Sequence, residues 1–186
     1  RETIINCNSN VIIYYPPGYD KSSHNPSFAI LNEPSPVEKV LDSSSLKVSF
    51  SEFLDRQIAQ VSFGSNVDLY GTGEVMGDLI RNGKTVKLWN TDNYEYGKGN
   101  GQRLYQSHPW VLGVGENGKS FGVIADNTWK MEISLGERIT FSSEGPAFRI
   151  IVIEKDSPQE VMKELGELTG TIELPPLWSL GFHQCR

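Results

Sequence analysis

The sequence predicts an all-β domain, an antiparallel β-sandwich with one helix near its C-terminal end. Three observations support this prediction. Several short segments alternate apolar and polar residues, which is the period of a strand with one buried face. Gly, Pro and Asn punctuate these segments at short intervals, and an Asn-Gly pair separates two of them. Helical periodicity occurs in a single late segment.

The N-terminal part of the chain contains five predicted strands. Residues 11–15 form a β-rich apolar run that stops at Pro-Pro-Gly, and residues 27–31 form a short strand that ends before Pro-Ser-Pro. Leu46, Val48 and Phe50 alternate with polar neighbours, and residues 58–63 form another strand-like segment. After a turn at residues 64–66, a short strand leads into Tyr70.

The strand signal strengthens beyond residue 110. Residues 111–114 and 121–125 flank the sequence ENGK at 116–119, which predicts a β-hairpin. Residues 131–135 and 139–141 form a second pair around a Gly-Glu turn, and residues 148–153 form a nearly continuous apolar strand. Together these segments give about ten short strands, the pattern of a sandwich.

One helix follows the last of these strands. Ser157 is a good N-cap, Pro158 suits the first helical position, and Glu160 completes a capping box. Apolar residues recur at helical spacing from Val161, and Gly170 is a natural stop. The pair at 175–176, Pro-Pro, predicts a stiff connector, and the apolar segment from residue 177 predicts the first strand of another domain.

Composition excludes several classes of function. The 186 residues are 38% hydrophobic, so the chain can bury one sizeable core. The net charge is −6 and Lys and Arg do not cluster, which disfavours a nucleic-acid partner. No apolar run approaches the roughly 20 residues that span a bilayer. The three histidines, His24, His108 and His183, are too scattered to predict a metal site, and no cofactor motif is present.

The chain is organised around residues 70–110. Glycines, aromatic residues and neutral hydrogen-bonding side chains crowd together there, with Asp92 among them. A Gly-rich run of this length predicts a shaped loop in preference to a strand, and such loops carry binding residues. Aromatic faces beside polar side chains suit a sugar. Glu74 is interpreted as tying this loop to the sandwich, and His108 as a buried structural histidine.

Several segments together resemble glycoside hydrolase family 31, the α-glucosidases and α-xylosidases. The matching sequences are YGTGE at 70–74, WNTD at 89–92, LYQSHPW at 104–110, FGV at 121–123 with Asn127, SPQEV at 157–161 and PPLWSLGFHQCR at 175–186. The match runs from Leu69 to the end of the chain. WNTD at 89–92 and QSHPW at 106–110 look most like the plant and bacterial branch of neutral α-glucosidases.

The resemblance implies a galactose-mutarotase-like β-sandwich that packs on a catalytic (β/α)₈ barrel. It divides this chain into a sandwich at residues 1–155, with a substrate loop at about 71–109, a helix and proline linker at 156–176, and the start of the first barrel strand at 177–186. Both carboxylates of the retaining mechanism would lie on the barrel, outside these residues. The expected partners are an oligosaccharide substrate and the catalytic barrel of the same protein. Neither nucleic acid nor a membrane is expected as a partner.

The resemblance also implies substrate-binding residues. Asp92 matches the acid that contacts sugar hydroxyls on the leaving-group side of the scissile bond. A second polar contact falls at Asn93 or Tyr94, and Trp89 is a candidate for stacking on a sugar face. The alternative interpretation is that Asp92 only caps a turn, which is a common role of aspartate in loops.

Two alternatives remain open at this stage: a free-standing carbohydrate-binding module that uses the same loop, and a structural or interaction domain. The proline linker and the strand predicted after it favour a piece of a larger hydrolase.

Overall fold

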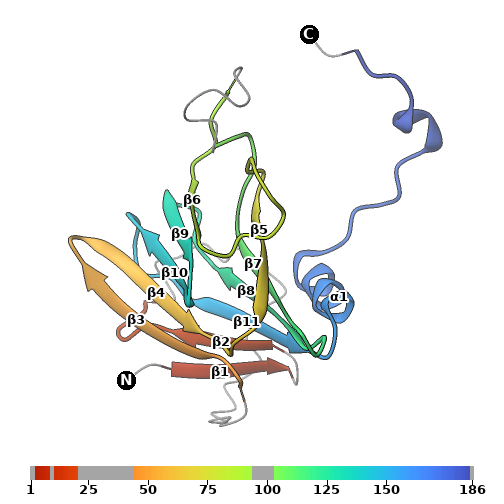
Figure 1. The fold of residues 1–186 in the computed structure, drawn as a ribbon. Coiled ribbons are helices and arrows are strands. Elements are labelled where there is room, and N and C mark those ends of the chain that lie inside the picture. The colour runs from red at the N-terminus through yellow and green to blue at the C-terminus, as the bar shows by residue number, and fades with distance from the viewer. Residues whose placement is uncertain (1–2, 9–10, 21–43, 94–102, 185–186) are drawn as a thin grey trace.

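In the residues that the structure describes, the fold consists of two antiparallel sheets and one α-helix (Figure 1). The computed structural model describes residues 3–8, 11–20, 44–93 and 103–184. The six-stranded sheet has the order β1 (Thr3–Asn8), β2 (Val11–Tyr15), β11 (Ile150–Lys155), β8 (Ser120–Ala125), β7 (Ser107–Gly115), β5 (Val67–Gly73). The five-stranded sheet has the order β3 (Lys47–Phe53), β4 (Arg56–Ser62), β10 (Arg138–Ser143), β9 (Met131–Leu135), β6 (Lys84–Leu88). The predicted sandwich is confirmed.

The core consists of two layers of buried side chains. The larger layer lies between the sheets and includes Val48, Phe141 and Val152. The smaller layer lies on the other face of the six-stranded sheet and includes Ile13 and Ile151. Neighbouring residues of β11 therefore belong to opposite layers, which explains its nearly continuous apolar sequence.

Helix α1 (Pro158–Thr169) covers that second face, where it contacts β7, β8 and β11. The Ser157 hydroxyl accepts the Glu160 N–H at 3.3 Å and donates to the Glu160 carboxylate at 3.0 Å, so the predicted cap is present. Val161 is buried, as its helical spacing predicts. Glu164 is buried as well, and it forms an ion pair with Lys155 at 2.9 Å that ties α1 to β11.

The edge strand β5 is capped by the chain that follows it. The Asn82 side chain accepts the Leu69 N–H at 2.8 Å and donates to the Val67 carbonyl at 2.8 Å. The Arg81 N–H donates to the Leu69 carbonyl at 2.7 Å. These groups occupy the positions that a neighbouring strand would use, which protects the edge from pairing with another chain.

The structure corrects the prediction that residues 70–110 form one loop. Strands β5, β6 and β7 all extend into this stretch, and the loop is confined to their connections. The end of β5 was not predicted because it contains glycines at 71 and 73. The backbone passes through a bulge there, with φ values of 106° and 87°. Two strands were not predicted: β1, whose sequence does not alternate, and β6, whose alternation around Val86 and Leu88 is only five residues long.

Two other predictions have different outcomes. The segment from residue 177 begins with a 3₁₀ turn, Leu177–Leu180, instead of a strand. A strand requires a neighbour for its backbone hydrogen bonds, and this segment runs away from the sandwich in Figure 1. The strand expected at residues 27–31 lies outside the described residues.

Close packing of Trp110 on Gly122 fixes how β7, β8 and α1 meet. A Cβ at residue 122 would lie 2.0 Å from Trp110 Cη2 and 3.0 Å from Val161 Cγ1. The indole thus occupies the space that any larger side chain on β8 would need.

We expect Gly122→Ala to lower the free energy of unfolding by about 1–3 kcal/mol, because the added methyl displaces the indole from a packed site. Gly136→Ala is the matched control: no atom lies within 4 Å of its added Cβ, and a change within about 0.5 kcal/mol is expected. Urea unfolding of both variants measures the difference. Equal midpoints would contradict the packing argument.

Candidate functional site

The connection between β6 and β7 forms the candidate site, and its two arms are pinned together at the base. The Thr91 N–H donates to the Leu104 carbonyl at 2.8 Å, and the Leu104 side chain is buried. The Thr91 hydroxyl donates to the Trp89 carbonyl at 3.0 Å. Residues 94–102 between the arms lie outside the described residues, and Tyr94 is one of them.

Glu74 connects this loop to β5, as predicted from the sequence. Its carboxylate accepts the Tyr105 N–H at 3.0 Å, and its own N–H donates to the Gln106 carbonyl at 2.9 Å. The approach is close: a Cβ on Gly73 would lie 2.7 Å from the Gln106 carbonyl oxygen. Glycine is therefore favoured at residue 73 for two reasons: its φ is positive, and a side chain would clash with the Gln106 carbonyl.

Asp92 projects from the pinned base, and its side chain is exposed. Its Oδ1 accepts a hydrogen bond from the Tyr105 hydroxyl at 2.9 Å. Asn93 is half-buried beside it. The candidate acid thus stands in solvent with one oxygen already held by a neighbouring phenol.

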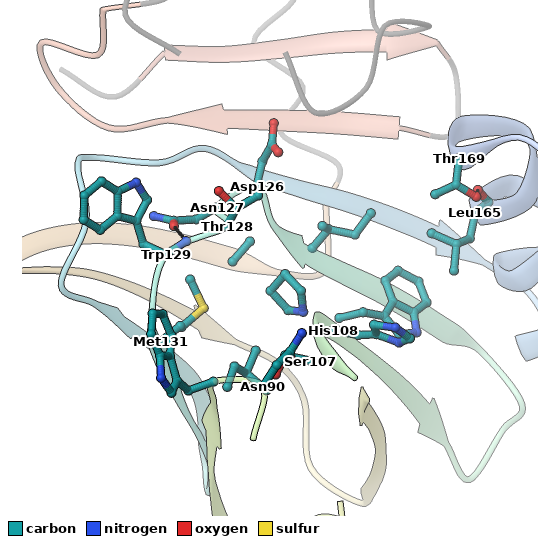
Figure 2. Close-up of a pocket in the computed structure, with 16 residues that line it drawn as sticks. Asn90, Ser107, His108, Asp126, Asn127, Thr128, Trp129, Met131, Leu165 and Thr169 are labelled. Carbon is teal, nitrogen blue, oxygen red and sulfur yellow. Dashed lines mark hydrogen bonds between the residues drawn. The ribbon is translucent and has the colours of Figure 1, made fainter. Parts of the chain in front are cut away.

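A pocket of about 680 Å³ opens between this end of the sandwich and α1 (Figure 2). Most of its lining is apolar or aromatic, with polar groups at Asn90, at residues 107–108 and 126–128, and at Thr169. The lining residues are Leu88, Trp89, Asn90, Ser107, His108, Pro109, Trp110, Ile124, Ala125, Asp126, Asn127, Thr128, Trp129, Met131, Leu165 and Thr169. Trp89 is therefore in the pocket wall, whereas Asp92 and Asn93 are not. The structure does not gather all predicted binding residues in one cavity.

His108 lies in the pocket wall as well, and its side chain is exposed. The expectation of a buried histidine is wrong. In β7 the neighbouring residues face opposite sides of the sheet, and this end of the strand extends past the cover that α1 provides. No acid hydrogen-bonds the imidazole among the described residues.

The turn after β8 supplies pocket residues that sequence reasoning missed. The Trp129 N–H donates to the Asn127 side chain at 2.7 Å, which shapes the turn. The Trp129 ring lies against Gly145, where an added Cβ would come 2.3 Å from its Cγ, yet 59% of the residue is exposed. Asn127 was noted only as part of a resemblance, and no periodicity distinguishes Trp129 from an ordinary core aromatic.

A buried ion pair fixes the start of this turn. Arg149 Nε donates to Asp126 Oδ2 at 2.7 Å, and Arg149 Nη1 donates to the Tyr15 hydroxyl at 3.2 Å. Both charged side chains are less than a tenth exposed. Burial disfavours the Arg149 charge, but the hydrogen bonds to Asp126 and Tyr15 outweigh it and hold the pKa of Arg149 above its usual value. The pair joins the ends of β2, β8 and β11 beneath the pocket rim.

We expect Arg149→Met to lower the free energy of unfolding by about 3–5 kcal/mol, because it leaves the Asp126 carboxylate buried without its cation. Adding Asp126→Asn should recover part of that loss, since the second change removes the stranded charge. The exposed Arg138→Met is the control, with an expected change within about 0.5 kcal/mol. Urea unfolding at neutral pH measures all three. A single variant as stable as the control would contradict a structural role for the pair.

The described part of the chain contains neither a cluster of possible metal ligands nor a membrane-spanning helix. Three or more His, Cys, Asp or Glu side chains do not converge anywhere within it. No helix there is long and apolar enough to cross a membrane.

Comparison with known proteins gives a consistent family. Residues 41–133 match the family model described as the glycosyl hydrolase 31 N-terminal galactose mutarotase-like domain. The chain is 39% identical over 120 residues to alpha-glucosidase 2 of Bacillus thermoamyloliquefaciens, and the matched segment covers 63% of this chain and 15% of that protein. It is 34% identical over 126 residues to alpha-xylosidase XylQ of Lactiplantibacillus pentosus, and the matched segment covers 66% of this chain and 16% of that protein.

Solved structures agree with the sequence relatives. A family 31 alpha-glucosidase from Bacteroides thetaiotaomicron superposes with a TM-score of 0.64 at 50% identity, over 70% of this chain and 22% of that one. The family 31 dextranase of Flavobacterium johnsoniae shares the fold over 96% of this chain and 27% of its own, with a TM-score of 0.77 at 19% identity. The chain thus spans about one-sixth of the curated relatives it matches. Because the family model matches half of its residues and the relatives agree, this chain belongs to glycoside hydrolase family 31, as the N-terminal galactose mutarotase-like domain of that family.

Proposed function

We propose that this chain is the N-terminal domain of a retaining α-glucosidase-like hydrolase that releases terminal α-linked glucose from oligosaccharides. In this proposal the domain contributes a substrate-binding loop, and a following (β/α)₈ barrel supplies the nucleophile and the general acid/base. The names of the relatives support an α-glucosidase, with an α-xylosidase as the neighbouring specificity.

One observation carries the role of the loop. The exposed carboxylate of Asp92 stands on a base that is pinned to β5 and β7 by backbone and side-chain hydrogen bonds. A carboxylate accepts hydrogen bonds from sugar hydroxyls, and a fixed base lowers the entropy lost when it does so. Asp92 would bind the sugar on the leaving-group side of the scissile bond, with Asn93 and Tyr94 nearby as further polar contacts and Trp89 as a stacking face.

Exposed apolar side chains beyond α1 support docking on a barrel. Beyond α1 the chain carries six large apolar side chains that are each at least 72% exposed: Ile172, Leu174, Leu177, Trp178, Leu180 and Phe182. The pocket between α1 and the sandwich is mostly apolar too. Apolar surface of this extent marks an interface. We assign the sandwich to residues 1–155, the linker to 156–176, and the beginning of the barrel to 177–186.

A second candidate is a carbohydrate-binding module without catalysis. The exposed rings of Trp89 and Trp129 in one pocket favour it, because aromatic faces stack on sugars. Retention of the isolated chain on immobilised malto-oligosaccharide, with no hydrolysis by the full-length protein, would decide for this candidate.

We expect Asp92→Ala in the full-length enzyme to lower kcat/KM for maltotriose by roughly 10- to 100-fold, the range for loss of one or two hydrogen bonds to a charged group. The loss should be smaller for p-nitrophenyl α-glucoside, whose leaving group has no hydroxyls. Glu137→Ala, an exposed acid in the β9–β10 turn, is the control. Equal kinetics of Asp92→Ala and wild type on both substrates would overturn the proposed role of the loop.

The isolated 186-residue chain should associate in solution, because the apolar surface beyond α1 has no barrel to cover it. Leu174→Asn combined with Trp178→Asn should restore a monomer, whereas Leu79→Asn, at an equally exposed apolar residue outside this surface, should not. Analytical ultracentrifugation measures the mass of each variant. A monomeric wild-type chain would count against docking through this surface.

A further inference from the structure

Tyr105 is held at both its backbone and its side chain, in the middle of the loop base. Its N–H donates to the Glu74 carboxylate at 3.0 Å, and its hydroxyl donates to Asp92 Oδ1 at 2.9 Å. The residue therefore connects an acid on the sandwich with the acid that the proposed function places against substrate.

The neighbours of Tyr105 on both sides are fixed as well. Leu104 is buried and its carbonyl accepts the Thr91 N–H, while the Gln106 carbonyl accepts the Glu74 N–H. With the backbone restrained on both sides, only two side-chain torsions set the position of the Tyr105 hydroxyl. A phenol on such a base is a rigid hydrogen-bond donor.

The carboxylate of an exposed aspartate needs such a donor if it is to bind in one orientation. An unrestrained Asp side chain rotates among several rotamers, and binding must then order it. A hydrogen bond at Oδ1 restricts that rotation and leaves Oδ2 able to accept from a sugar hydroxyl. The donor is neutral, so it orients Asp92 without cancelling its charge.

We propose that Tyr105 is a positioning residue for Asp92, and that Glu74 in turn holds Tyr105 in place. This inference rests on the proposed function, because it assumes that Asp92 contacts substrate. Tyr105 acts through the orientation of the carboxylate and takes no part in bond cleavage.

The test is Tyr105→Phe in the full-length enzyme, which removes the hydroxyl and keeps the ring. We expect kcat/KM for maltotriose to fall roughly 3- to 10-fold, the effect of one hydrogen bond, mainly through a higher KM. The fall with p-nitrophenyl α-glucoside should be several-fold smaller. Tyr70→Phe is the matched control: this half-buried tyrosine has no side-chain hydrogen bond among the described residues, and its variant should behave as wild type.

A double-mutant cycle with Asp92→Ala, which removes the acceptor of the Tyr105 hydroxyl, separates positioning from general stabilisation. If Tyr105 acts through Asp92, Tyr105→Phe should produce little further loss in the Asp92→Ala enzyme. Unfolding temperatures of the single variants should match, because both side chains are exposed.

The possible outcomes distinguish the positioning role of Tyr105 from the proposed substrate-binding role of Asp92. Impairment by Asp92→Ala together with a wild-type Tyr105→Phe enzyme, or with fully additive losses, would overturn positioning and leave the proposed function standing. An Asp92→Ala enzyme with wild-type kinetics on maltotriose would remove both. Dependent losses that are larger for maltotriose than for p-nitrophenyl α-glucoside would support the positioning of Asp92 by Tyr105.

Discussion

Burial of the six-stranded sheet on both faces is the constraint on which the rest of this domain depends. Strand β11 packs against the second sheet with one set of side chains and against α1 with the other. Because α1 must cover the outer face, the Lys155–Glu164 ion pair and the cap at Ser157 have to fix where the helix starts. The pocket is a consequence, since it forms where α1 ends and β7 and β8 continue.

Charged groups in this domain divide by burial into two kinds of role. Arg149 and Asp126 are both buried, and separating them would leave an uncompensated charge worth several kcal/mol, so this pair is structural. Asp92 is exposed and receives one hydrogen bond from a neutral donor, an interaction that contributes little to stability in water. A hydrogen bond that stabilises the fold so little is better explained by binding than by folding.

Two different surfaces meet at one end of the domain. The loop base presents Asp92 and leads into the apolar pocket through Trp89, and the exposed apolar segment beyond α1 continues from the helix that lines the same pocket. In the proposed hydrolase, the apolar surface would hold the domain on the barrel and the loop would reach the substrate. Rigid docking matters for the loop, because an acid on a moving support cannot orient a sugar against carboxylates on another domain.

The sequence by itself determined the sandwich, the capped helix, the β7–β8 hairpin and the family, because alternation, Asn-Gly and Ser-Pro-x-Glu are local signals. It identified Asp92 and Trp89 as candidates and interpreted Glu74 correctly. Only the tertiary structure showed that residues 70–110 include one whole strand and parts of two others, that His108 is exposed, and that Trp129 shares a pocket with Trp89. These features depend on contacts between residues far apart in the chain: Gly145 against Trp129, Glu74 against Tyr105, and α1 against only part of β7. Local sequence patterns carry no record of such pairings, since each is decided by where the strands and the helix come to rest.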